Sequence, residues 1–310
     1  YKLKLNGLST PQGTIPLRAL KEICDILLET AERGLRLAVE SESVKPGKLP
    51  SWLAASLNMT VTGLEKGSTC LAIDVPVLGE TAGKRIAQQN LWNTAPKPDD
   101  TAFSLLSRAV SATTTGKEDS YYYDKGVLDS LLKIKPFIHD YADKMELSCL
   151  EKKKDHFILG EKELDKILNL KTKTPEPQAM VISGKFDLIE HAKKRFRLQL
   201  SNGETLIGTI DPEHLSVEQM RKHWGGSATV KGMVHYHPSG KPRLIVADVI
   251  KEMTTGEEIL SYMPRIQTEI EYISQARTMA GHKKDWLKEI WNKWPGDESV
   301  DELLAALKHT

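Results

Sequence analysis

The stretch that decides the fold is Phe196-Arg-Leu-Gln-Leu-Ser-Asn-Gly-Glu-Thr-Leu-Ile-Gly-Thr-Ile210. Apolar and polar residues alternate on each side of Asn202-Gly203, which is the pattern of paired β-strands with one buried face. Asn-Gly between two such runs is a strong hairpin signal, because a type I′ turn needs a positive φ at both central positions. We therefore predict a β-hairpin over this stretch.

Three further strands are predicted around the hairpin. Met180–Glu190 precedes it, and Ser227–Tyr236 and Arg243–Ile250 follow it on either side of a turn that contains Pro and Gly. A short helix is expected between the third and fourth strands, opened by Asp211-Pro212, with a capping box at Ser216–Gln219 one step later. Five strands with a helix in this place indicate an OB-like β-barrel over residues 178–252.

Glycine and phenylalanine positions support the barrel. Gly184, Gly208 and Gly232 fall inside strands, where small barrels use glycine to bend sharply. Phe186 and Phe196 are expected in the barrel core rather than on a surface that stacks bases.

Residues 1–172 predict an α+β domain of unknown role. The clearest element is a helix at Leu17–Glu40, in which apolar residues recur three and four positions apart. Residues 79–98 show no strong period and are expected to form a loop, and the polar segment Lys171–Gln178, with two prolines, has the composition of a linker. The remaining elements are strands at Tyr1–Leu5, Asn58–Gly63, Ser68–Val75, Met145–Leu150 and His156–Leu159, and helices at Thr101–Ala112, Val127–Tyr141 and Gly160–Leu170.

Charge and cysteine content narrow the class of protein. The 310 residues carry 43 Lys and Arg against 42 Asp and Glu, so any binding to nucleic acid or to an anionic membrane needs a local patch. Cys24, Cys70 and Cys149 are widely spaced and odd in number, which argues against a disulfide framework or a zinc site. A reducing, cytoplasmic compartment fits best, and no apolar run is long enough for a spanning helix.

The barrel loops are candidates for nucleic-acid binding. OB barrels often bind oligonucleotides through strands 2 and 3 and the loops that join strands 1–2 and 4–5. Both loops are basic here, and Tyr236 could stack on a base while the cations meet phosphates. The alternative is a solvated surface, because residues 175–250 carry ten Lys and Arg against eight Asp and Glu. The candidate residues are Lys193, Lys194, Arg195, Arg197, Tyr236, Lys241 and Arg243.

The C-terminal tail, residues 256–310, has the composition of a helical docking element. Three of the six tryptophans lie within nine residues, from Trp286 to Trp294. Pro295-Gly296 then breaks the helix, and a capping box at Ser299–Glu302 starts a short last helix with a leucine face. Tryptophan dominates interface hot spots, although these residues could also pack the tail onto its own body.

The end of this tail resembles a known family. Trp294-Pro-Gly-Asp-Glu298, followed by Asp301-Glu-Leu-Leu304, resembles the terminal element of bacterial antitoxins encoded beside PIN-domain ribonuclease toxins. The resemblance covers about 15–20 residues and implies a short helix and an extended strap that wrap a toxin and obstruct its metal-dependent active site. The partner-binding residues that it implies are Trp286, Trp291, Trp294, Pro295, Asp297, Glu298, Leu303, Leu304 and Leu307.

The rest of the chain departs from that family. Such antitoxins are usually short and carry an obvious DNA-binding module, whereas no ribbon-helix-helix or swapped-hairpin pattern is present in this sequence. The resemblance therefore does not extend to transcriptional autoregulation. The OB-like barrel is the alternative module for that role. The whole chain also resembles uncharacterised bacterial proteins with a comparable OB-like segment.

No catalytic, phosphate-binding or metal-binding motif is recognised in the sequence. His235-Tyr-His237 would place two imidazoles on one strand face, but without a third ligand we expect solvent-facing histidines. The acids at 297, 298, 301 and 302 fit the first turn of a helix, where they complement its dipole. The sequence thus predicts an α+β protein, made of an N-terminal α+β domain, an OB-like barrel and a helical tail.

The function predicted from these features is that of a non-enzymatic, antitoxin-like binding protein without a cofactor. Its partner is a PIN-domain toxin, bound through the tail. The first alternative is a nucleic-acid-binding adaptor that acts through the barrel, and an enzyme with an unrecognised site comes third.

Overall fold

The computed structural model describes residues 1–261 and 266, apart from 12, 46, 66–68, 88–95, 153, 191–193 and 212–213. The chain divides into two units, Tyr1–Thr268 and Glu269–Thr310, and every described residue belongs to the first. We call the described part of this first unit the body. Of the tail, the structure describes a 3-10 turn, η2 (Glu257–Ser261), together with Gly256 and Ile266, and the rest lies outside the described residues.

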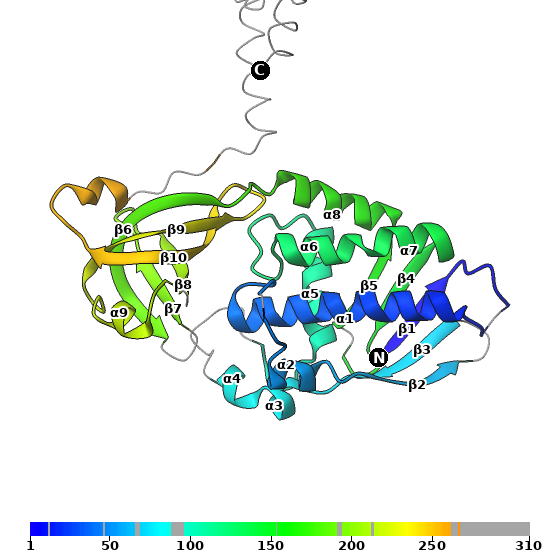
Figure 1. Ribbon diagram of the computed structural model, residues 1–310. Helices are drawn as coiled ribbons and strands as arrows, with labels where there is room; N and C mark the ends of the chain where they lie inside the picture. Colours follow the sequence, from blue (N-terminus) through cyan, green and yellow to red (C-terminus); the bar gives the residue numbers. More distant parts are fainter. Residues whose placement is uncertain are drawn as a thin grey trace, which may run out of the picture. The chain divides into compact units, whose positions relative to one another are not determined.

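The N-terminal half contains a five-stranded antiparallel sheet in the order β2-β3-β1-β4-β5. Its central strand is the first in the chain, and the antiparallel pairs β2–β3 and β4–β5 add to opposite sides of it (Figure 1). Leu3 and Leu5 alternate with polar neighbours and face the core. The strands are β1 (Lys2–Asn6), β2 (Thr60–Glu65), β3 (Thr69–Asp74), β4 (Lys144–Ser148) and β5 (His156–Gly160).

Helices pack beside this sheet, and among the described residues α1 (Leu17–Glu40) contacts α2, α5, α6 and α7. The bounds of α1 are those predicted, and its apolar stripe, which includes Ile23, Leu27 and Leu35, is buried. Figure 1 shows α1 running along the group formed by the later helices. The others are α2 (Ser51–Ser56), α3 (Leu78–Thr81), α4 (Gly83–Ala87), α5 (Ala102–Thr114), α6 (Lys125–Leu132), α7 (Ile134–Tyr141) and α8 (Glu161–Lys173).

Two predictions for this half are corrected by the structure. The segment 79–98 is not a plain loop, because α3 and α4 occupy its described first part. The helix expected over 127–141 is two helices, separated at Lys133. Pro136 explains the break: it lies in the first turn of α7, where a missing N–H leaves no helical hydrogen bond unmade.

The second half is a closed barrel of five strands with the order β10-β8-β7-β6-β9. All neighbouring pairs are antiparallel except β8 with β10, which run parallel. This mixed, closed arrangement fits the OB-like barrel that the sequence predicts. Its elements are β6 (Gln178–Glu190), β7 (Arg195–Gln199), β8 (Thr205–Ile210), α9 (Val217–Arg221), β9 (Ser227–Tyr236) and β10 (Pro242–Glu252).

The β7–β8 hairpin is present, but its turn is not type I′. Gly203 has φ +82, whereas Asn202 is absent from the positive-φ residues of the described chain. Leu200 accepts a hydrogen bond from Gly203 N at 3.0 Å, and its own N–H donates to Glu204 O at 2.8 Å. A three-residue loop with glycine in the left-handed region therefore closes the hairpin.

The helix of the barrel starts later than predicted. Asp211 O accepts from the backbone N–H of Leu215, but the regular helix α9 begins only after Ser216. There the predicted capping box is confirmed: Ser216 N donates to the Gln219 side chain at 2.8 Å, and Gln219 N donates to Ser216 Oγ at 3.3 Å.

Strand glycines make the barrel close tightly. A Cβ on Gly208 would overlap the Phe196 ring at 2.1 Å, and one on Gly232 would meet Val246 O at 2.0 Å. Phe196 stacks on Phe186 with 4.8 Å between ring centroids, and both are fully buried. The prediction that these two rings fill the core is confirmed.

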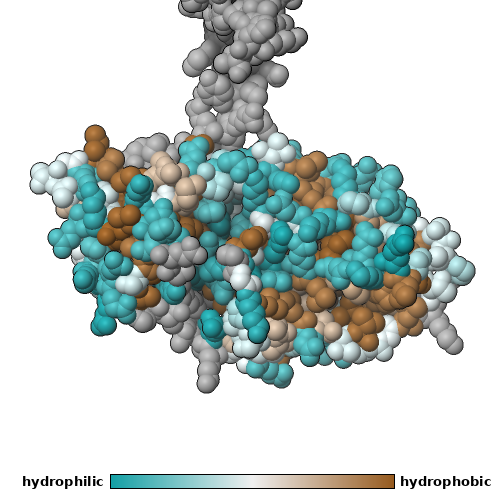
Figure 2. Space-filling view, in the orientation of Figure 1, coloured by the Kyte–Doolittle hydropathy of each residue, from teal (hydrophilic) through white to brown (hydrophobic). Residues whose placement is uncertain are grey.

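Two separate hydrophobic clusters underlie the two halves. One collects residues between Leu3 and Leu170, and the other collects barrel residues between Ile182 and Ala247. Figure 2 shows hydrophobic residues on the viewed face in separate groups, with hydrophilic residues between them. In the part of the chain that the structure describes, no helix is long and apolar enough to cross a membrane.

Candidate functional site

The residues expected to bind a protein partner lie outside the described residues. These are Trp286, Trp291, Trp294, Pro295, Asp297, Glu298, Leu303, Leu304 and Leu307. The structure therefore bears on the barrel candidates, on the contact between the two halves of the body, and on its cavities.

The seven candidates for nucleic-acid binding are not brought together on one exposed face. Lys193 lies outside the described residues, and Lys194 and Lys241 are exposed. Arg197 is held by Asp187, with Nε 2.8 Å from one carboxylate oxygen and 3.0 Å from the other. This contact and the burial of the other three candidates change what the set can do.

Arg195 and Arg243 point into the protein rather than to solvent. Arg195 is 3% exposed and donates from Nη2 to Val39 O at 2.8 Å. Arg243 is 6% exposed and donates from Nη1 to Ser41 O at 3.0 Å. Both carbonyls belong to the C-terminal end of α1, whose last turn has no basic residue of its own. Since the carbonyl end of a helix is the negative end of its dipole, the two arginines cap α1 from the barrel.

The end of α1 is shaped for this contact. Ser41 takes a left-handed conformation with φ 66, and its N–H donates back to Leu37 O at 2.9 Å. This conformation ends the helix in the manner of an αL cap. Sequence alone gives no reason to connect this turn with arginines about 150 and 200 residues later.

Tyr236 is also buried, which removes it as a stacking platform. Its side chain is 4% exposed, and its hydroxyl donates to Met180 Sδ at 3.0 Å. Burial raises the pKa of the Tyr236 phenol to about 12, because the charged form would lose its hydration. The expectation that Tyr236 presents its ring to a base is therefore corrected.

Asp124 is the acid that completes the contact with Arg243. One carboxylate oxygen caps α6 by accepting from Val127 N at 3.0 Å. The other accepts from Ser43 N at 3.1 Å and lies 3.6 Å from Arg243 Nη2. One carboxylate thus holds the start of α6, the turn after α1 and strand β10 together.

The turn after β9 makes the remaining contacts with the N-terminal half. Ser239 donates its hydroxyl hydrogen bond to Asp119, and the His237 ring meets Tyr121 edge to face at 5.0 Å. We call these contacts, with those of Arg195 and Arg243, the seam.

The expectation of solvent-facing histidines is wrong for both members of His235-Tyr-His237. His237 is 1% exposed and His235 is half-buried. Loss of hydration and the nearby Arg243 lower the pKa of each imidazole to about 4, against the attraction of Asp124 or Asp119. Both histidines are therefore neutral at physiological pH, because the nearby carboxylates do not offset the loss of hydration and the charge of Arg243.

A cavity of about 260 Å³ lies along the seam. Glu42, Asp124 and Arg243 line it together with His235. Burial raises the pKa of Glu42, against the attraction of Lys45 and Arg243. Of the other charged groups in its lining, Lys125 pairs with Glu176, and Asp129 pairs with Lys171 at 2.6 Å. The charged groups of this cavity are mostly paired with one another, which is typical of a structural boundary.

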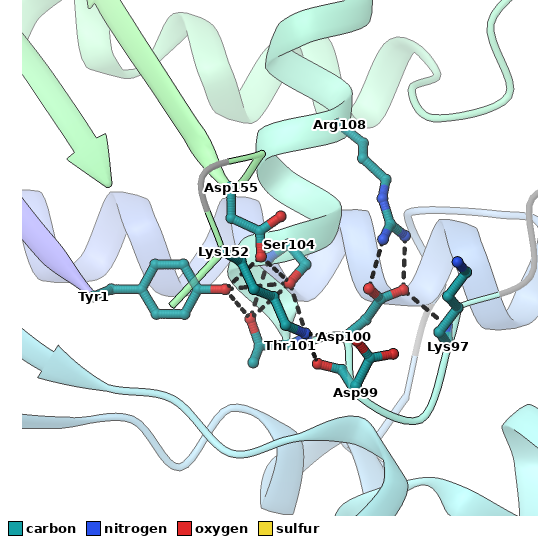
Figure 3. A network of polar contacts seen from close by, with 9 residues as sticks. All are labelled: Tyr1, Lys97, Asp99, Asp100, Thr101, Ser104, Arg108, Lys152 and Asp155. Atoms are coloured by element: carbon teal, nitrogen blue, oxygen red, sulfur yellow. Dashed lines mark hydrogen bonds and ion pairs between the residues drawn. The ribbon is translucent and has the colours of Figure 1, made fainter. Parts of the chain in front are cut away.

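A second polar cluster braces the N-terminal half (Figure 3). The Asp155 carboxylate accepts from Ser104 Oγ at 2.5 Å and from the Tyr1 hydroxyl at 2.9 Å. Thr101 and Ser104 form the capping box of α5. Burial raises the pKa of the Tyr1 phenol above its ordinary value. With no imidazole among these residues to activate the serine, the cluster satisfies buried polar groups and joins β1, α5 and the turn before β5.

Figure 3 also shows the neighbouring ion pairs at the start of α5. Arg108 donates from Nη1 and Nη2 to the two carboxylate oxygens of Asp100, at 2.7 and 2.5 Å. Lys152 pairs with Asp99 at 3.0 Å. This bidentate contact fixes the Arg108 guanidinium and joins α5 to the segment before it.

One group of side chains in the described chain could hold a cation. The ligand atoms of Asp211, His214 and Asp248 lie within 4.8 Å of one another. The parallel pairing of Ile210 with Ala247 brings the two aspartates side by side, and the bulge after Ala247 falls at Asp248. His214 Nδ1 already lies 2.9 Å from Asp211 Oδ2. Two oxygens and one nitrogen suit a divalent metal, although no metal site is predicted from the sequence.

Comparison with protein-family models, curated proteins and solved structures finds no match to this chain. The functional assignment therefore depends on its own residues.

The residues that the sequence reasoning missed lie in the segment between α5 and α6. Asp119, Tyr121 and Asp124 all contact the barrel or stand at its edge, yet this segment reads only as polar. Asp124 before an apolar helical run is a readable cap signal. Its second role with Arg243 has no signal in the sequence, because the pairing joins residues more than 100 positions apart.

Proposed function

We propose that this chain is a non-enzymatic, antitoxin-like binding protein that neutralises a PIN-type ribonuclease toxin through its C-terminal tail. The observation that carries the proposal is the sequence Trp294-Pro-Gly-Asp-Glu298 with the leucines at 303, 304 and 307. A large aromatic anchor, a sharp change of direction and a short apolar helix are suited to neighbouring grooves of one partner.

The chemistry of the tail suits a metal-dependent nuclease. Asp297 and Glu298 follow directly after the Pro-Gly step, so carboxylates and the Trp294 anchor are close along the chain. A nuclease site that holds a divalent cation attracts anionic groups. Carboxylates placed there by an anchored strap would compete with the phosphates of RNA.

The contacts of the barrel arginines also support this proposal. Arg195 and Arg243 cap α1, Arg197 is paired, and Tyr236 is buried. Nucleic-acid binding through these OB-like loops would have to depend on Lys193, Lys194 and Lys241. This residual set gives the adaptor alternative less support than the tail gives the toxin partner.

A reconstituted nuclease assay tests the proposal. The full chain and a chain ending at Ala280 are each mixed with a purified PIN-domain ribonuclease from the same genome. We expect the full chain to form a stable complex and to suppress RNA cleavage, and the shortened chain to do neither. Equal inhibition by both chains, or none by either, would contradict the proposal. Matching thermal transitions of the two chains would show that the body is intact.

A further inference from the structure

A cavity of about 530 Å³ opens beside α5, and its lining includes Asp119 and Tyr121, which also contact the barrel at the seam. One edge of α5 lines it with Ser107, Arg108 and Ser111. The segment between α5 and α6 adds Lys117, Tyr121 and Tyr122, and the β4–β5 turn adds Lys154. We call it the α5 cleft. Its volume lies in the range of sites that take small organic ligands, which is about 300–1,000 Å³.

The cleft has an excess of positive charge. Arg108 is neutralised by Asp100, and the acid in the lining, Asp119, accepts a hydrogen bond from Ser239. Lys117 and Lys154 are exposed, and within the described chain neither ammonium group has an ion-pair partner. Asp119 offsets one of these two charges, so the lining keeps an excess of one positive charge, which attracts an anion.

A buried hydroxyl in the same lining indicates a ligand more directly. Ser107 is 2% exposed, and among the described residues its Oγ has no hydrogen-bond partner. An unmet buried hydroxyl is destabilising, so such groups usually find an oxygen or nitrogen partner. The hydroxyl of Ser111 lies one helical turn further along the same helix edge. Serine hydroxyls beside lysines are common donors to phosphate oxygens.

Two tyrosines supply a surface for a ring. Tyr121 is 43% exposed, although its other contact is with His237, and Tyr122 is half-buried. Exposed tyrosine rings stack on nucleobases, which have a flat π-face. The side chain of Tyr123 helps to hold this segment, because its hydroxyl donates a hydrogen bond to Lys117 O at 2.6 Å.

We propose that the α5 cleft binds a nucleoside phosphate, with the phosphate at Lys117, Lys154 and the serine hydroxyls and the base against the tyrosines. The size of the cavity favours a mononucleotide over free phosphate, which would leave most of it vacant. The site belongs to the body, so its failure would leave the toxin-binding proposal standing.

Calorimetric titration of the full chain tests this inference with AMP, adenosine, inorganic phosphate and a short single-stranded RNA. We expect AMP to bind at least about tenfold more tightly than adenosine or phosphate, since each of these lacks one half of the contacts. AMP affinity should fall as salt rises. Absence of AMP binding at millimolar concentration would overturn the proposal. RNA binding in this cleft without AMP binding would overturn it in favour of a nucleic-acid site.

Variants separate the cleft from general charge effects. Lys117→Gln with Lys154→Gln should weaken AMP binding by about tenfold or more, whereas Lys162→Gln, exposed on α8, should not change it. Ser107→Ala should lower AMP affinity several-fold without lowering the melting temperature, because it removes a hydroxyl that has no partner within the described chain. Unchanged AMP affinity in the lysine variant would contradict the assignment.

Discussion

The barrel loops and the C-terminal tail both carry residues whose types predict contact with a partner, and the two regions teach different lessons. In the barrel, Arg195, Arg243 and Tyr236 contact the chain itself. The tail concentrates tryptophans in a segment that belongs to a different unit from the body. Basic residues in a loop beside a second domain can therefore serve to dock the two domains of one chain, and they are not by themselves evidence of a nucleic-acid site. Barrel substitutions should therefore change stability, and tail substitutions should change binding.

Arg243→Ala should give the largest loss of stability among the seam variants. It leaves the Ser41 carbonyl and the Asp124 carboxylate without their buried cation, which should lower the free energy of unfolding by about 3 kcal/mol. Chemical denaturation measures this loss. Arg221→Ala, an exposed change on α9, is the control and should stay within about 0.5 kcal/mol. An Arg243 variant as stable as this control would mean that the seam does not hold the halves together.

The seam histidines should make stability depend on pH. Their pKa values fall from 6.5 to about 4 in the folded chain, so the unfolded chain binds more protons between these values. The stability that they contribute is complete above pH 6.5 and is lost as the pH falls towards 4. From pH 7.5 to 5.5 we expect a loss on the order of 1 kcal/mol for each histidine.

A double variant, His235→Gln with His237→Gln, isolates this effect. Its unfolding free energy should change less between pH 7.5 and 5.5 than that of the unmodified chain. Parallel pH curves for the two proteins would show that the histidines are solvated and that the seam is open.

The smallest effect is expected from the exposed barrel lysines. Lys193→Ala with Lys194→Ala spares Arg195, and it should change the free energy of unfolding by less than about 0.5 kcal/mol. We expect no binding of single-stranded RNA by these loops at micromolar protein. Three results together would show that the barrel is a nucleic-acid site. RNA would bind, its affinity would fall as the salt concentration rises, and the double variant would show a weaker dependence on salt.

The sequence predicts most of the barrel because its signals are local. Strand alternation, Asn202-Gly203 and the capping box at Ser216 each act over a few residues. The type of the hairpin turn was missed because the loop takes in Ser201 as well. The break before α7 depended on Pro136, a local signal that the longer helical period concealed.

The seam could not be predicted from the sequence, because its contacts are made between distant segments. In the sequence, Arg195 and Arg243 look the same whether they contact phosphate or the carbonyls at the end of α1. The α5 cleft could not be predicted from the sequence either, because only the fold brings Lys154 to the edge of α5. By contrast, the tail prediction depends on a short local pattern, which is why it can be tested by single substitutions.

Measuring both thermal melting and toxin affinity for Trp294→Ala and Arg243→Ala tests the central claim most directly. We predict that Trp294→Ala weakens binding to the PIN-domain ribonuclease by about 2–4 kcal/mol and leaves the melting transition of the body unchanged. Arg243→Ala should do the reverse, with a lower melting temperature and unchanged affinity per folded molecule. If Trp294→Ala instead lowers the melting temperature sharply and leaves toxin affinity unchanged, Trp294 is a structural residue and the antitoxin-like function is contradicted.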